Sequence, residues 1–190
     1  MSRRLWIWGV ILGALSGIAA DAPLTYRNIN VDIVDNFFRN FLSFLPGLIF
    51  GIFALGYFYF IRKSLIGWKS ILWLAASSCS FAAAFFIAMT IAVNDAKQPT
   101  SQIGPFIGMG LAGFIGGLIV LLGFRLFISR IDIIHTAVFI IATTLIAAMP
   151  LWAIPIFGEW NFVNLFIPWQ TAVLLITGHA LHVARSGKEI

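Results

Sequence analysis

Three histidines are the side chains of this sequence whose type and spacing best suit a reactive or ligand-binding site. His179 and His182 lie three positions apart in one apolar segment, so a helix presents both on the same face. His135 begins another apolar segment. Imidazole nitrogens bind zinc and haem iron, so these three residues are weak candidates for a cofactor-binding site. The alternative is that they are interfacial side chains exposed to lipid headgroups.

A metal or haem centre would need ligands beyond these three imidazoles. Cys79 is the single cysteine, in an apolar run where we expect a buried thiol, and no carboxylate completes a metal-binding set. Two histidines three positions apart on a helix cannot bind the two faces of one haem. We therefore predict no metal ion and no cofactor.

Catalytic groups are also scarce inside the apolar segments. No Asp, Glu or Lys lies in the middle of any of them, and Arg125, the deepest strong charge, is close to a segment end. A carboxylate proton relay or an acid–base pair at membrane depth is therefore not expected. The sequence contains no phosphate-binding glycine loop, nucleophile elbow or HExxH helix. No catalytic residue is predicted, and an enzyme is the least favoured class.

Small residues recur at helical spacing in two of the apolar segments. Gly9, Gly13 and Gly17 follow one another at intervals of four, which places them on one face of a helix. A flat face of this kind lets a second helix approach closely. The predicted helix-packing residues are Gly9, Gly13, Gly17, Gly108, Gly113 and Gly117.

Polar but uncharged side chains inside the apolar segments are the candidates for lining a binding cavity. They are Ser77, Ser78, Thr143, Thr144 and Gln170. Hydroxyl groups in helices also donate hydrogen bonds to carbonyl groups of their own helix. Such internal bonding is the alternative interpretation of these residues.

The composition of the chain indicates a membrane protein, so membrane-spanning helices must position these residues. The chain of 190 residues is 61% hydrophobic and 10% charged, whereas soluble domains are about 25% charged. A helix of about 20 apolar residues crosses the hydrocarbon core of a bilayer. We predict an all-α integral membrane protein that is a single membrane domain over residues 1–190. Its six spans are predicted at about 5–20, 46–61, 71–93, 106–127, 133–152 and 166–184.

Basic residues mark every second junction between these spans. Nine of the twelve Lys and Arg residues belong to this set: Arg3, Arg4, Arg62, Lys63, Lys69, Arg125, Arg130, Arg185 and Lys188. Basic loops stay on the cytoplasmic side during insertion, so both termini are predicted to be cytoplasmic. Six of the seven tryptophans lie near predicted boundaries, where the headgroup region favours an indole ring. The net charge of +5 is thus a topology signal, and no nucleic-acid partner is predicted.

Two segments on the predicted outer side allow specific expectations. Residues from about 31 to 45 place phenylalanines on one helical face and polar residues on the other, which predicts an amphipathic interfacial helix between spans 1 and 2. The first span is short, and the residues before Ala20 resemble a signal-peptidase site. A cleaved signal peptide is therefore the alternative to a retained first helix.

Prolines stand near the predicted outer start of the three inward-going spans. They are Pro46, Pro105 and Pro168. Proline is tolerated in the first turn of a helix, which explains the pattern. Three related two-helix units are the alternative explanation.

Two classes of function follow from these patterns. The first is an accessory, assembly or immunity-type subunit of a bacterial inner membrane, which acts through helix packing with other membrane subunits or with itself. The second is a small permease or substrate-binding transport component for a weakly polar or hydrophobic solute. For this class, residues 104–117 resemble the glycine-rich helix of the six-helix substrate-binding components of vitamin transporters. The resemblance implies a small six-span substrate-binding protein, although no polar ligand-binding set accompanies it.

Overall fold

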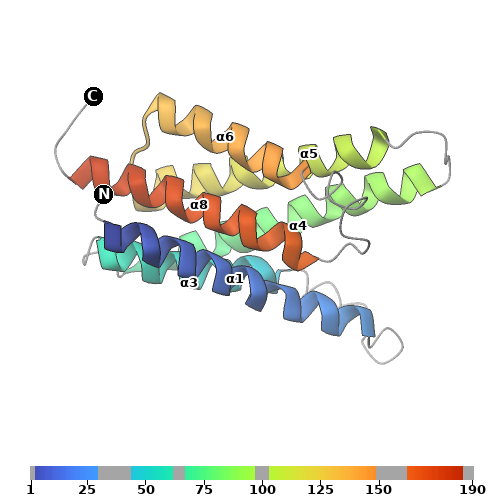
Figure 1. Cartoon of the computed structure of the whole chain (residues 1–190), viewed down its shortest axis with the longest axis horizontal. Coiled ribbons are helices and arrows are strands. Elements are labelled where there is room, and N and C mark those ends of the chain that lie inside the picture. The colour runs from blue at the N-terminus through green and yellow to red at the C-terminus, as the bar shows by residue number, and fades with distance from the viewer. Residues whose placement is uncertain (1–2, 30–43, 62–66, 97–102, 149–161, 186–190) are drawn as a thin grey trace.

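The structure is a computed structural model that describes residues 3–29, 44–61, 67–96, 103–148 and 162–185. Within these residues the chain is helical and contains no β-strand, so the predicted all-α class is confirmed for them. Figure 1 labels the helices, which are α1 (Arg3–Ile29), α3 (Leu45–Ile61), α4 (Trp68–Ala96), α5 (Ile103–Gly123), α6 (Ile133–Ala148) and α8 (Phe162–Arg185). A short π-helix, η1 (Phe124–Ile128), continues α5.

Three stretches of helix are long and apolar enough to cross a membrane. They are Arg3–Ala20 in α1, Trp68–Ile87 in α4 and Ile107–Ile128 in α5 and η1. The helices α3 and α6 are apolar but shorter. Lengths and compositions of this kind are those of a membrane protein.

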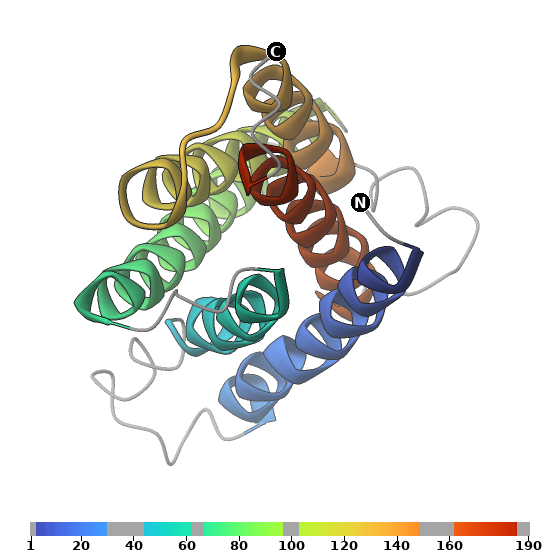
Figure 2. The ribbon, with the colours of Figure 1, turned by 90° about the vertical axis from the view of Figure 1, so that its left-hand side faces the viewer.

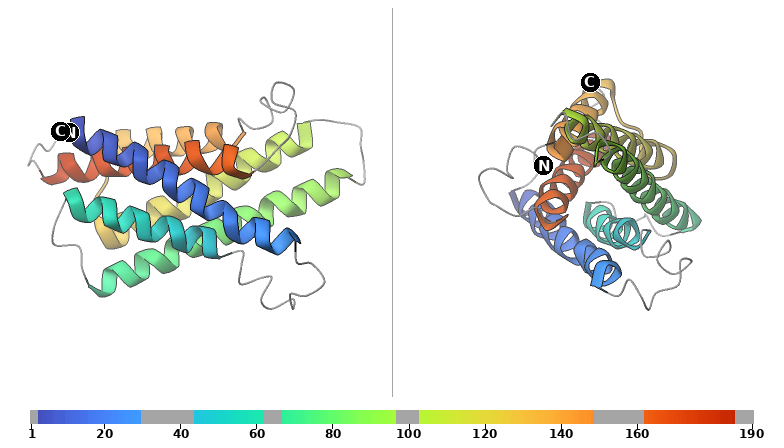
Figure 3. Two further views of the ribbon diagram at one scale, coloured as in Figure 1. Left: turned by 60° about the horizontal axis from the view of Figure 1, so that its bottom comes forward. Right: turned by 90° about the vertical axis from the view of Figure 1, so that its right-hand side faces the viewer.

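The six helices form a closed ring, which Figure 2 shows from one end. Each helix packs against the next one along the chain, and α8 closes the ring by packing against α1. Figure 3 shows α1 crossing between α8 and α3, both of which it contacts. Neighbours run antiparallel, so the start of α1 and the end of α8 lie at the same end of the bundle (Figure 1).

Helix α1 is longer than the predicted first span. It continues nine residues beyond Ala20, through Asp21 and Pro23, to Ile29. The apolar window does end at Ala20. The predicted end at residue 20 is therefore the end of the apolar window and not the end of the helix, because a polar residue changes hydropathy without breaking backbone hydrogen bonds. Ala20 itself is fully buried, in a cluster with Phe81, Phe85 and Phe166.

The other predicted spans match helices with shifted ends. Helix α3 covers the predicted span 46–61, α4 extends beyond 71–93 at both ends, and α8 begins four residues before 166. Helix α6 begins at the predicted residue 133, and residues 149–152 lie outside the described residues. The predicted interfacial helix also falls on residues outside them, apart from its last two residues, Phe44 and Leu45, the second of which begins α3.

The fourth predicted span contains a change of helix type near its inner end. The amide of Ser129 donates to the carbonyl of Phe124 at 2.9 Å, which is an i to i+5 hydrogen bond. This π-helical turn follows Gly123 and keeps Phe124 and Ile128 buried in the main core. The hydrophobic pattern alone predicted an uninterrupted α-helix there.

An aromatic cluster fills the main core between α3, α4 and η1. The rings of Phe58, Trp73 and Phe124 meet edge to face, with centroid distances of 5.3–6.3 Å. The indole nitrogen of Trp73 donates to the carbonyl of Gly51 at 3.3 Å. This contact satisfies the polar atom of a ring that is 0% exposed.

Two of the tryptophans near predicted boundaries have rings that pack inside the protein. Trp73 and Trp169 are buried inside the protein, with 0% and 7% exposure. Trp6, Trp8 and Trp68 are exposed. A position near a helix end does not fix the direction of the ring, because the helical phase turns some end residues toward neighbouring helices.

Helix α8 is the most shielded of the six. Among its side chains from residue 166 to 184, only Ala184 is exposed. Pro168 is the seventh residue of this helix, whereas Pro46 and Pro105 lie in the first turns of α3 and α5. The first-turn explanation is therefore wrong for Pro168.

Candidate functional site

Asp132 begins the site by capping helix α6. Its Oδ1 accepts a hydrogen bond from the backbone amide of His135 at 2.7 Å. Its own carbonyl oxygen accepts from the amide of Thr136 at 3.0 Å and from the hydroxyl of Thr136 at 2.7 Å. An aspartate at this position satisfies an amide that has no partner within the helix, and its charge is favourable at a helix N-terminus.

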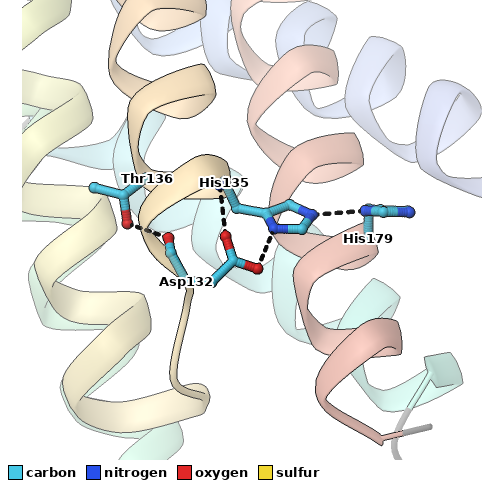
Figure 4. A network of polar contacts seen from close by, with 4 residues as sticks. All are labelled: Asp132, His135, Thr136 and His179. Carbon is cyan, nitrogen blue, oxygen red and sulfur yellow. Dashed lines mark hydrogen bonds and ion pairs between the residues drawn. The ribbon is translucent and has the colours of Figure 1, made fainter. Parts of the chain in front are cut away.

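His135 links this cap to helix α8, as Figure 4 shows. Its Nδ1 lies 2.6 Å from Oδ2 of Asp132, and its Nε2 lies 2.8 Å from Nδ1 of His179. The two imidazole centroids are 5.0 Å apart. The His135 side chain is 15% exposed and that of Asp132 is 41% exposed, so the chain of contacts runs from solvent into the protein.

His179 ends the chain of contacts on the face of α8 near α1. Its ring lies 6.4 Å from the ring of Trp6, centroid to centroid. His182 lies one helical turn further along α8. The hydrogen bonds in Figure 4 thus join His135 and His179 of the three predicted candidates. Within the described residues, no group of three or more His, Cys, Asp or Glu side chains is arranged to hold a metal ion.

The carboxylate of Asp132 bonds directly to His135 and was not among the predicted site residues. Asp132 lies just outside the apolar segment that His135 begins, and a search confined to apolar segments misses it. The signal was present as an aspartate three residues before a histidine at a helix start. The hydrogen bond from the His135 amide, followed by the interactions with the His135 ring, lowers the pKa of Asp132.

The predicted packing glycines lie at contacts between helices. A Cβ atom added to Gly9, Gly13 or Gly17 would lie 2.5–2.7 Å from atoms of α8. Gly113 and Gly117 of α5 face Ala147 and Thr143 of α6 in the same way, and Gly108 is buried. These contacts are all within one chain.

The five predicted cavity residues are distributed over different helix contacts. Ser77 and Ser78 of α4 lie against the glycines of α3, while Thr143 of α6 lies against Gly117. The hydroxyls of Ser77, Thr143 and Thr144 donate to carbonyl groups of their own helices at 2.8–3.1 Å. Gln170 lies elsewhere, at the contact between α1 and α8.

Gln170 forms a polar contact that leaves one of its atoms without a partner. The hydroxyl of Ser16 lies 2.6 Å from Oε1 of Gln170 and 2.9 Å from the carbonyl of Gly13. Nε2 of Gln170 and the hydroxyl of the adjacent Thr171 are buried without a hydrogen-bond partner. If the amide is turned over, it donates to Ser16, and its oxygen is then left without a donor. Ser16 was not among the predicted site residues, although it lies between the packing glycines Gly13 and Gly17.

Cys79 corrects the expectation of a buried thiol, because it is exposed on helix α4. The apolar sequence around Cys79 does not show which face of α4 packs against other helices, so the burial of its side chain depends on the packing of α4.

No protein-family model, curated protein or solved structure matches this chain.

Proposed function

We propose that the protein is a multi-pass subunit of the bacterial inner membrane that acts through its surfaces, as an accessory, assembly or immunity-type component. The observation that carries this proposal is the chemistry of the interior. Among the described residues, the buried polar side chains are uncharged: Ser16, Ser77, Ser80, Thr143, Gln170 and Thr177. All five hydroxyls are within hydrogen-bonding distance of backbone carbonyls. Such an interior supports helix packing and offers no buried acid–base pair.

The antiparallel ring supports a topology with both termini in the cytoplasm. The helix ends that carry Arg3, Lys69, Arg125 and Arg185 belong to the same end of the bundle. Under the positive-inside rule, the end of a membrane protein that carries most of the basic residues is the cytoplasmic end. Large apolar side chains are exposed on α1, α3, α4, α5 and α6, where they suit contact with lipid or another subunit.

The exposed face of α3 is the surface we propose for a partner helix. Gly56 is exposed there, and a Cβ added to it would meet no atom within 4 Å. Its exposed neighbours on α3 include Ile52 and Phe60, and the ring of Phe60 stacks on Trp8 at 6.1 Å. A glycine inside a helix costs about 1 kcal/mol relative to alanine. Close approach of another membrane helix is the gain that offsets this cost.

Substitution of Gly56 tests the proposal. Gly56→Leu should abolish a complex that is isolated after mild detergent extraction, because the added side chain blocks the approach, while the unfolding temperature stays unchanged or rises. Gly113→Leu is the matched control, since Gly113 faces Ala147 within the chain and its substitution should damage the fold itself. A Gly56→Leu protein that still migrates with its partner counts decisively against this surface.

The second candidate function is a small permease or substrate-binding transport component, and the unpaired Gln170 amide favours it. Gln170 is 0% exposed, and Thr171 beside it also has a hydroxyl without a partner. A weakly polar solute would pair with these atoms only after α1 and α8 move apart, because Gly13 packs directly against Thr171 at this contact. At 100 times its dissociation constant, such a solute would stabilise the protein by about 2.7 kcal/mol.

A thermal-shift screen with Gln170→Met as the control distinguishes this candidate. The solute should raise the unfolding temperature of the natural protein and leave that of the variant unchanged. Without solute, the variant should be the more stable of the two, because it no longer buries an unpaired amide. Equal responses of the two proteins to every solute would remove the argument for a binding site at Gln170.

A further inference from the structure

A continuous chain of hydrogen-bonded ionisable groups runs from Asp132 through His135 to His179 (Figure 4). We propose that these residues form a proton-binding site, which takes up one proton at Nε2 of His179 and holds its charge on His135. The site belongs to the basic end of the bundle, where α6 begins and α8 ends. The proposal does not depend on the proposed subunit function, because it concerns proton uptake by the chain itself.

The contacts fix the tautomers of both rings before the proton is taken up. The Asp132 carboxylate only accepts hydrogen bonds, so the proton of His135 lies on Nδ1, 2.6 Å from Oδ2. Nε2 of His135 is then an acceptor. The 2.8 Å contact therefore requires that His179 carries its proton on Nδ1. Nε2 of His179 keeps a lone pair and is the basic atom at the end of the chain.

Uptake of one proton reverses the hydrogen bond between the rings. A proton from water binds to Nε2 of His179, and the Nδ1 proton of that ring moves across the 2.8 Å contact to Nε2 of His135. The N–H bond of His179 breaks as the N–H bond of His135 forms. His179 is neutral again, with its proton on Nε2, and His135 is the cation. Both hydrogen bonds of the chain are kept, and the net charge of the three groups rises by one.

The surrounding charges favour His135 as the place for this cation. The carboxylate of Asp132 is in direct contact with its ring and stabilises the charged form. The ring of His179 instead contacts two other rings, those of His135 and Trp6. At this end of the bundle, the elements around His179 carry further charged or titratable groups, which are Arg3 and Arg4 of α1, Tyr57 and Tyr59 of α3, Arg130 before α6, and His182 and Arg185 of α8.

A second proton would break the site. Both facing nitrogens, Nε2 of His135 and Nδ1 of His179, would then carry hydrogen, and neither could accept. The contact between α6 and α8 at this point would change from a hydrogen bond to a repulsion. The site therefore takes up a single proton while it remains closed.

The short distance between the rings favours a shared proton over a bridging metal ion. Zinc binds imidazole nitrogen at about 2.0–2.1 Å with tetrahedral angles, which places two ligand nitrogens about 3.3 Å apart. The observed separation of 2.8 Å is that of a hydrogen bond. Asp132 would support either role, so the experiment includes zinc as a separate arm.

Nitrogen NMR of the full chain in detergent micelles, with ¹⁵N-labelled histidine, tests the proposal. Above the uptake step, His135 and His179 should both carry their proton on Nδ1. Below it, His135 should carry protons on both nitrogens and His179 on Nε2 alone. Rings that titrate independently of each other, or a neutral His135 with its proton on Nε2, would overturn the assignment.

Asp132→Asn is the decisive variant, because asparagine also caps helices but has no negative charge. It should move the uptake step to lower pH, because the substitution removes the negative charge in contact with the His135 ring. His182→Gln, on the same helix, is the matched control and should leave the tautomers of the other two histidines unchanged. An uptake step at the same pH in Asp132→Asn contradicts the proposal. Zinc that binds at micromolar concentration and displaces the shared proton would replace it with a metal site.

Discussion

At the scale of single residues, a few polar atoms in this protein have contacts that the hydrophobic pattern could not predict. Asp132 both caps α6 and orients His135, so one carboxylate serves the helix and the site. Ser16 and Gln170 pair across the contact between α1 and α8. In each case the partner comes from a separate segment or from just beyond an apolar one, where sequence spacing gives little information.

The carboxylate of Asp132 makes stability dependent on pH in acid. Its pKa in the folded protein lies below the ordinary value of 3.8, so its stabilising contribution is complete above that value and is lost as the pH falls toward the folded pKa. The unfolding temperature of the natural protein should therefore fall more steeply below pH 3.8 than that of Asp132→Asn. Thermal unfolding in detergent at several acidic pH values measures the difference, and parallel curves would contradict the prediction.

At the scale of elements, glycine determines how closely the helices approach. Gly13 lies against the backbone of Thr171, so the chain offers no flexible side chain that could move aside. Helix α8 is shielded by these close contacts, because it packs against α1, α3 and α6. A shielded helix tolerates polar residues, which explains why α8 carries Gln170 and two histidines and is not among the three helices that are long and apolar enough to cross a membrane.

Two glycine-to-alanine substitutions separate packing from helix propensity. Gly13→Ala should destabilise the protein by about 1–3 kcal/mol, because the new methyl group meets the Thr171 backbone at 2.5 Å. Gly110→Ala is the control, since a Cβ there meets nothing within 4 Å. It should leave stability unchanged or raise it by about 1 kcal/mol. Thermal unfolding of the two variants in the same detergent gives the comparison, and equal losses would show that close packing is not the cause.

At the scale of the whole molecule, the order of the ring follows the order of the chain. Short connections favour antiparallel neighbours, and the last helix meets the first. The described helix ends that adjoin the basic junctions therefore all lie at one end of the bundle. The basic residues that are predicted to orient the chain and the Asp132–His135–His179 site lie at this same end.

Fusion of reporter proteins tests the orientation of the molecule. We expect a fluorescent protein fused after residue 190 or after Arg130 to be fluorescent, because both positions are predicted to be cytoplasmic. Alkaline phosphatase fused after residue 98 should be active, because this junction is predicted to be external. Phosphatase activity at residue 130 with fluorescence at residue 98 would show that the protein has the inverse orientation.

The sequence by itself determined the class of the protein and the approximate positions of its helices. Apolar length and the alternation of basic residues are properties of segments, and they can be read without knowledge of neighbours. The glycine spacing also indicated which faces of α1 and α5 would be suitable for close contact. The glycine spacing could not predict which helix would pack against each face, because a face of small residues can accept many different helices.

Only the tertiary structure decided which side chains meet. It buried Trp73 and exposed Cys79, because rotation of α4 about its axis depends on all the helices that pack against it. It also brought His135 to His179 across 44 positions of sequence and added Asp132 to the pair. Local patterns depend on the chemistry of neighbouring residues in the chain, whereas a site depends on the distances that the closed ring of helices imposes.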